Sequence, residues 1–254
     1  MYPVDMRKGL YNRCSMTKDE FLKILAEKGL ELSDRQMEQF CTYAAFLKEY
    51  NEKINLTAIC EFEEVLDKHF YDSLLLSFDV KLLSFDVKME GTLVDVGTGA
   101  GFPGVVLKIA YPGLRVILIE PLMKRCVFLN ELINKLGLEG IEVINTRGED
   151  YSLLHREEYD YVTARAVTNL NALIEVCGAM VKKNGYFIAL RGSSGQSEID
   201  GAGNAIKQMN FKCERIIEHT LIDGSLRVIG YLKKVGATPK KLPRKYSIIK
   251  QRPL

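Results

Sequence analysis

The residues best suited to form a binding site follow a short apolar run near position 95. Residues 92–104 read Thr-Leu-Val-Asp-Val-Gly-Thr-Gly-Ala-Gly-Phe-Pro-Gly. The apolar part predicts a strand, the alternating glycines predict a tight turn, and Pro103 suits the first turn of a helix, which needs no N–H from it. A strand, a glycine turn and a helix joined this closely let a ligand lie against bare backbone.

Two kinds of ligand fit this pattern. Asp95 to Gly101 read Asp-x-Gly-x-Gly-x-Gly, which is typical of S-adenosylmethionine-dependent methyltransferases. Gly99 to Gly104 also match the dinucleotide pattern G-x-G-x-x-G, which is weak when it stands alone. Asp95 favours the methyl donor, because an acid repels a pyrophosphate but tolerates the ammonium group of a sulfonium amino acid. A glycine turn that binds nothing is the third alternative.

The elements around this turn alternate between strand and helix patterns. Apolar runs at 92–96, 115–119, 141–145, 159–164 and 186–190 predict strands, and helical patterns occupy 103–111, 122–136 and 168–183. This order indicates a parallel sheet covered on both faces. Two later runs, 211–222 and 226–233, are joined by Asp223-Gly224-Ser225 and predict a hairpin. We predict an α/β protein with the Rossmann-like methyltransferase fold, a mostly parallel seven-stranded sheet with a C-terminal antiparallel hairpin.

An N-terminal helical extension precedes this sheet. Thr17 and Glu20 form a capping box ahead of one helix, Ser33 or Asp34 caps a second, and a third is expected over 61–76. Residues 77–83 are followed by a tandem copy up to Lys88, which suggests a linker. We therefore divide the chain into an N-terminal helical region with a linker (1–90), a methyltransferase domain (91–236) and a basic C-terminal tail (237–254).

The composition limits the compartment and the partners. Hydrophobic residues make up 47% and charged residues 27% of 254 residues, as in ordinary soluble proteins. Because there is no membrane-length apolar run and no signal layout, a cytoplasmic protein is expected. We also expect a monomer. The six cysteines are scattered, which argues for reduced thiols. His69, His155 and His219 lack metal-ligand spacing, so no metal is expected.

Positive charge is concentrated at the C-terminus. The net charge is +2, yet the residues from Lys233 onward include eight Lys or Arg and no acid. The prolines there predict an extended tail. Such a tail suits RNA phosphates, with Lys240, Lys241, Arg244 and Lys245 as the candidate contacts. A solvated terminus is the alternative.

Further candidates stand at the ends of the predicted strands. Glu120 ends the second strand, where a carboxylate can accept hydrogen bonds from a ribose diol. Residues 147–150 follow the third strand and are placed to reach the adenine. Arg191 ends the fifth strand, where it could hold a phosphate or the O6/N7 edge of guanine. Arg191 could also be a partly exposed charge, and Glu120 a solvated acid.

These motifs together resemble a known family. Asn55-Leu56-Thr57, residues 69–74 (His-Phe-Tyr-Asp-Ser-Leu), the glycine segment, Arg147-Gly148-Glu149, Ala164-Arg165-Ala166 and the tail closely resemble the bacterial methyltransferases once called glucose-inhibited division protein B. The resemblance implies methylation of N7 of a guanine in 16S ribosomal RNA, with the RNA or the small ribosomal subunit as partner. It also implies that S-adenosyl-L-methionine contacts Gly97, Phe102, Gly148, Glu149 and Arg165. Glu120-Pro121 departs from the family, in which the second strand more often ends Asp-Ser.

The chemistry of N7 fits what the sequence contains. Guanine N7 has an in-plane lone pair and no proton, so no catalytic base is needed, and we expect catalysis mainly by positioning. The chain has no Pro-Pro pair, as amine methylation usually requires, and no cysteine after proline, as C5 methylation commonly does. In this interpretation Arg165 orients the cofactor and Arg191 the substrate. A small-molecule methyltransferase, an RNA-binding protein with a degenerate cofactor pocket and an NAD-dependent oxidoreductase remain alternatives.

Overall fold

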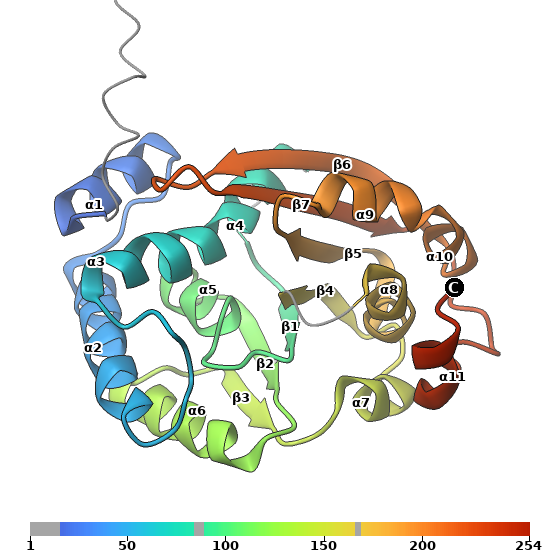
Figure 1. Cartoon of the computed structure of the whole chain (residues 1–254), viewed down its shortest axis with the longest axis horizontal. Helices are drawn as coiled ribbons and strands as arrows, with labels where there is room; N and C mark the ends of the chain where they lie inside the picture. The colour runs from blue at the N-terminus through green and yellow to red at the C-terminus, as the bar shows by residue number, and fades with distance from the viewer. Residues whose placement is uncertain (1–15, 84–88, 166–168) are drawn as a thin grey trace, which may run out of the picture.

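A single seven-stranded sheet forms the centre of the molecule (Figure 1). The computed structural model describes residues 16–83, 89–165 and 169–254. The strand order is β3-β2-β1-β4-β5-β7-β6, and the first five strands are parallel, whereas β7 runs antiparallel to β5 and to β6. The strands are β1 (Thr92–Val96), β2 (Arg115–Ile119), β3 (Ile141–Ile144), β4 (Tyr159–Arg165), β5 (Val181–Arg191), β6 (Phe211–Thr220) and β7 (Leu226–Lys234). The predicted fold and its C-terminal hairpin are confirmed.

Helices cover both faces of this sheet, and each face has its own apolar core (Figure 1). The core on one face joins α1, α2, α4, α5 and α6, and the core on the other joins α8, α9, α10 and α11. The helices are α1 (Lys18–Glu27), α2 (Asp34–Asn51), α3 (Phe62–Val65), α4 (Asp72–Leu83), α5 (Gly104–Ala110), α6 (Met123–Leu136), α7 (Gly148–Leu154), α8 (Leu170–Gly178), α9 (Gly195–Gly201), α10 (Gly203–Gln208) and α11 (Tyr246–Gln251), with a π-helical turn, η2 (Leu66–Tyr71), between α3 and α4.

The N-terminal helices begin where their capping residues predict. Thr17 and Ser33 each accept a hydrogen bond from the backbone three residues later, and Glu20 and Gln36 complete the two capping boxes. The helix expected over 61–76 is divided into α3, η2 and α4. Single π-helical turns are frequent at functional sites, because the extra residue re-aims the side chains that follow.

The tandem copy and the tail differ from the sequence prediction. Residues 77–83 lie in α4, and Ser77, Phe78 and Asp79 are buried, so this first copy is a packed helix and not a linker. The second copy, 84–88, lies outside the described residues. The tail is not extended throughout, because residues 246–251 form α11, which buries Ile249.

Between residues 146 and 191, one predicted helix is too long and one short helix was not predicted. The helix expected over 168–183 ends at Gly178, and β5 begins at Val181. The start of β5 is irregular, because Tyr159 pairs with Val181 but Tyr161 pairs with Tyr186, and Asn184 between them has φ of 67°. An irregular strand with polar residues lacks the alternation that identifies strands. Helix α7 was not predicted, and no side chain caps it.

The N-terminal helices share their core with the sheet, which leads to a test of cooperativity. The ring of Phe40 is fully buried, 4.9 Å from that of Phe70 and 5.8 Å from that of Phe21. We expect Phe40→Ala to lower the free energy of unfolding by about 3–5 kcal/mol through the cavity it leaves. Denaturant unfolding followed by circular dichroism should keep one transition at a lower midpoint. Lys23→Ala, at an exposed position of α1, is the control. A separate early transition in Phe40→Ala would contradict a core shared by the N-terminal helices and the sheet.

Candidate cofactor and substrate site

The glycine turn after β1 is held by a buried carboxylate. Asp95 is fully buried, and its Oδ2 accepts hydrogen bonds from the Thr98 hydroxyl (2.6 Å) and the Gly104 N–H (2.9 Å). These bonds tie the end of the strand to the start of α5 across the turn. From the sequence we expect Asp95 to lie near the ammonium group of a ligand. In the structure its hydrogen bonds are to the protein itself.

Two glycines of the turn are required by close packing. A Cβ on Gly101 would lie 2.6 Å from Val105 Cγ2 and 2.7 Å from the Tyr43 hydroxyl. On Gly104 it would lie 2.4 Å from Leu118 Cδ2. Gly99, by contrast, has φ of 62° and open space where its Cβ would be. The turn is therefore packed tightly on its protein side and open at Gly99.

An aromatic stack connects this turn to the N-terminal helices. The Phe102 ring is stacked on Tyr43 (centroids 5.5 Å apart) and on His69 (4.4 Å), and the Arg165 guanidinium lies 5.0 Å from its centroid. The Tyr43 hydroxyl donates to the Ala100 carbonyl at 2.5 Å, and burial raises the pKa of Tyr43. Phe102 is a predicted cofactor contact, and its ring is buried. Its stacking on Tyr43 and His69 also holds the wall of the site together.

His69 is a neutral hydrogen-bonding residue at this wall. Burial, aided by the Arg165 charge, lowers the pKa of His69 to about 3. Its Nδ1 lies 3.1 Å from the Lys68 carbonyl, which can only accept, so Nδ1 carries the proton. Nε2 therefore accepts from the Thr57 hydroxyl, 2.9 Å away. This bond joins the two motifs around Thr57 and His69, for which the sequence alone predicts no role.

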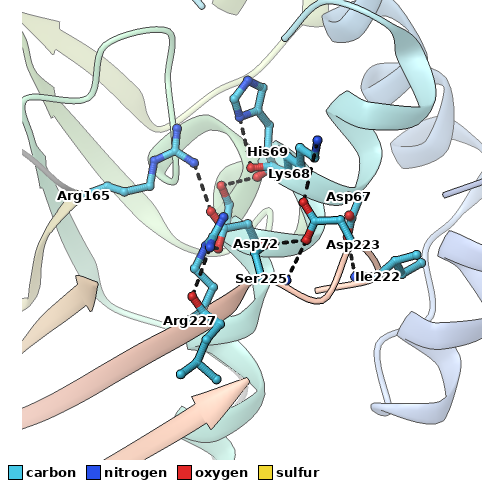
Figure 2. A network of polar contacts seen from close by, with 11 residues as sticks. Asp67, Lys68, His69, Asp72, Arg165, Ile222, Asp223, Ser225 and Arg227 are labelled. Atoms are coloured by element: carbon cyan, nitrogen blue, oxygen red, sulfur yellow. Dashed lines mark hydrogen bonds and ion pairs between the residues drawn. The ribbon is translucent and has the colours of Figure 1, made fainter. Parts of the chain in front are cut away.

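A carboxylate also holds two arginines beside the site. Asp72 Oδ2 lies 3.4 Å from Arg165 Nη1, and its Oδ1 lies 2.9 Å from Arg227 Nε. Figure 2 shows Asp72 between these two guanidinium groups, which come from the ends of β4 and β7. Burial raises the pKa of Asp72, and both arginines oppose that shift. The arrangement fixes the direction of Arg165 toward the ligand space.

Three adjoining cavities lie on the side of the sheet where β1 and β4 end. An inner cavity of about 160 Å³ is lined by Gly97, Gly148, Glu149, Leu173 and Tyr246, among others. A middle cavity of about 220 Å³ shares Gly97 with it and adds Gly99, Phe102, His69, Arg125 and Arg165. An outer cavity of about 380 Å³ shares His69 and Arg165 with the middle one and adds Lys68, Asp72, Arg191 and Arg227. A ligand space therefore runs from Gly148 past the glycine turn to the basic outer cavity.

The predicted cofactor contacts fit this space, with one difference. Gly97, Phe102, Gly148, Glu149 and Arg165 line the inner or middle cavity. Gly148 has no room for a side chain, because a Cβ would lie 2.6 Å from Val96 Cγ1. Glu120 lines neither of these two cavities. Its buried carboxylate accepts from the N–H groups of Gly99 (3.0 Å) and Leu122 (2.9 Å), so it orders the turn beside the expected ribose position.

The predicted RNA contacts are distributed unevenly. Arg191 lines the outer cavity, paired with Glu198 of α9. Lys240, Lys241 and Lys245 are exposed. Arg244, however, binds the fully buried Glu175 of α8 through a 2.6 Å ion pair, which argues against the predicted RNA contact because the charge is used inside the protein. The basic residue Lys234 is fully buried as well.

Comparison with solved structures supports the fold. The fold resembles the crystal structure of M. jannaschii TYW2 in complex with AdoMet, with a TM-score of 0.50 and 15% identity over 61% of this chain and 74% of that one. The five parallel strands and the C-terminal antiparallel hairpin have the arrangement of the Rossmann-like methyltransferase fold.

Sequence comparison is more specific. A family model described as rRNA small subunit methyltransferase G matches residues 36–220. Proteins named ribosomal RNA small subunit methyltransferase G from Bacillus licheniformis and Bacillus subtilis (strain 168) are 46% and 44% identical, over 91% of this chain and 95% of each relative. The one from Lysinibacillus sphaericus is 40% identical over 94% of this chain and 100% of that protein. The chain belongs to the rRNA small subunit methyltransferase G family.

Two findings concern what the described residues contain. Within residues 16–83, 89–165 and 169–254, no group of His, Cys, Asp and Glu side chains is arranged to hold a metal ion. In the same ranges, no helix is long and apolar enough to cross a membrane.

The buried Asp95 predicts a dependence of stability on pH. Burial raises the pKa of Asp95 from 3.8 to about 6 in the folded protein. The folded state thus binds a proton more tightly than the unfolded chain, and the charge costs about 3 kcal/mol above pH 6. That cost is relieved as the pH falls from 6 to 4. We expect the free energy of unfolding of wild type, relative to Asp95→Asn, to rise by up to about 3 kcal/mol between pH 7 and pH 4.

Denaturant unfolding of both proteins at each pH measures this difference. Asp19→Asn, at an exposed position of α1, is the matched control. A difference between wild type and Asp95→Asn that stays constant from pH 7 to pH 4 would contradict the buried, charged state of Asp95.

Proposed function

We propose that this chain transfers a methyl group from S-adenosyl-L-methionine to N7 of a guanine in 16S ribosomal RNA. The observation that carries the proposal is the row of cavities that meet at Gly97 and at Arg165, in a member of the rRNA small subunit methyltransferase G family. We further propose that it acts in the cytoplasm, as a monomer, on the RNA or on the small ribosomal subunit.

The inner and middle cavities suit the two ends of the cofactor. Bound S-adenosyl-L-methionine supplies an electrophilic methyl group on a sulfonium centre. Arg125 and Arg165 line the middle cavity and can hold the carboxylate of the methionine part. Gly148 and Glu149 line the inner cavity, where backbone groups and a carboxylate can recognise the adenosine part. Open backbone at Gly99 lets a ligand approach the turn between them.

The outer cavity suits a nucleotide of a polyanion. Its charged lining residues are Lys68, Asp72, Arg165, Arg191 and Arg227, which sum to a positive charge. Cationic side chains there can contact phosphates and the O6/N7 edge of a guanine. Because guanine N7 carries no proton, the site needs no base. His69 is consistent with this, since hydrogen bonds engage both of its ring nitrogens and its pKa lies at about 3.

Methyl transfer itself is the direct test of the function. Purified protein would be incubated with tritiated S-adenosylmethionine and, in separate reactions, with small ribosomal subunits or with free 16S RNA. The modified base would then be mapped. We expect label on N7 of one guanine. Label elsewhere in the RNA, or none, would contradict the proposal. Calorimetric titration with S-adenosylhomocysteine and with NAD separates the alternatives, because a degenerate pocket gives heat with neither and an oxidoreductase gives heat with NAD.

Arg165 provides the sharpest single substitution. Its guanidinium belongs to both the middle and the outer cavity, and Asp72 orients it. We expect Arg165→Ala to lower the rate of methyl transfer at least 100-fold, or about 2.7 kcal/mol of transition-state stabilisation, with the fold retained. Arg115→Ala, at an exposed position at the start of β2, is the control. If Arg165→Ala transferred methyl groups at the wild-type rate, Arg165 would not be part of the site.

The exposed lysines of the tail give a separate test of RNA binding. Deleting the whole tail would also remove the buried Leu242 and Ile249, so a triple substitution of Lys240, Lys241 and Lys245 by alanine is preferable. If each lysine neutralises one phosphate, the slope of log Kobs against log salt should become shallower by about 2. Binding to 16S RNA fragments at several salt concentrations measures this slope. An unchanged slope would exclude these lysines as RNA contacts.

A further inference from the structure

The C-terminal segment contributes to the same cavity as the predicted adenosine contacts. Tyr246, the first residue of α11, lines the inner cavity together with Gly148 and Glu149 from the start of α7. Another part of the lining comes from α8, through Ala172, Leu173 and Val176. No motif in the sequence connected Tyr246 with the cofactor, because almost 100 residues separate it from Gly148.

Specific contacts anchor the segment that carries Tyr246. Two residues before it, Arg244 binds Glu175 of α8 by its side chain and, at 2.8 Å, by its backbone N–H. The Arg156 guanidinium donates to the Leu242 carbonyl at 2.6 Å. Three residues after Tyr246, Ile249 is fully buried in the core that includes α8. Tyr246 is thus held at the cavity from both sides.

The lining of the inner cavity is mostly apolar, with Arg147 and Glu149 as its charged members, and suits a flat aromatic group with polar edges. Val96, Pro121, Leu173 and Val176 provide apolar walls, and Tyr246 adds an aromatic ring. An aromatic side chain provides a stacking surface for a nucleobase. The cavity adjoins, at Gly97, the middle cavity that would hold the methionine part.

We propose that Tyr246 binds the adenine base of the cofactor, and that the C-terminal segment 242–251 is part of the cofactor site as well as a carrier of positive charge. This inference rests on the proposed function, since it takes the inner cavity as the adenosine site. Within residues 240–245 the lysines are exposed to solvent, whereas Arg244 holds the segment against α8.

Calorimetric binding of two ligands without RNA tests the proposal. S-adenosylhomocysteine contains the adenine and the amino acid, whereas 5′-methylthioadenosine lacks the amino acid. We expect Tyr246→Ala to weaken both about tenfold and by equal factors, because the lost contact is with the shared base. Tyr246→Phe should bind like wild type. Ile248→Ala, at a position of α11 that is 45% exposed, is the matched control and should leave both affinities unchanged.

Thermal unfolding of each variant separates binding from folding. If Tyr246→Ala does not fold, Tyr246→Leu keeps an apolar side chain and removes the aromatic ring, and the same loss is expected. Unchanged affinity in the folded variant, or a loss for S-adenosylhomocysteine alone, would overturn the role of Tyr246. Failure of the wild-type protein to bind either ligand would instead overturn the proposed function.

Discussion

The buried carboxylate of Asp95 is the interaction on which the site depends. It accepts hydrogen bonds from Thr98 and Gly104 and so sets the path of the backbone between β1 and α5. Burying this charge is costly, as the raised pKa of Asp95 indicates. The cost is accepted in a turn that is open at Gly99 and closely packed at Gly101 and Gly104. Unfavourable burial of a titratable group is frequent at functional sites.

A second carboxylate positions the charges that face the ligand. Asp72 holds Arg165 and Arg227, so that two long side chains from different strands point in fixed directions. His69 lies next to Arg165 and stays neutral, which avoids adding a third positive charge beside them. His69 lies within the π-helical turn η2, and Asp72 directly follows it at the start of α4. The N-terminal helices thus form one side of the site, through the stack of Tyr43, Phe102 and His69.

The C-terminal segment contains two kinds of basic residue that its composition alone cannot separate. Eight basic residues from Lys233 onward suggest a uniform RNA-binding tail. In the structure Lys234 is buried and Arg244 is paired with Glu175, whereas Lys240, Lys241 and Lys245 face solvent. An arginine can serve either purpose, because its planar guanidinium group can pair in bidentate fashion with a carboxylate or with a phosphate. Its partner decides which.

The sequence by itself determined the sheet, its hairpin, the glycine turn and the family, because these depend on local periodicity, turn residues and short motifs. It did not determine the irregular start of β5, the short helix α7 or the π-helical turn, where no strong local pattern is present. Only the tertiary structure decided the partners of Glu120, Asp72, Arg244 and Tyr246. Those contacts join residues far apart in the chain, and a side chain's charge or ring does not specify which distant group the fold will bring to it.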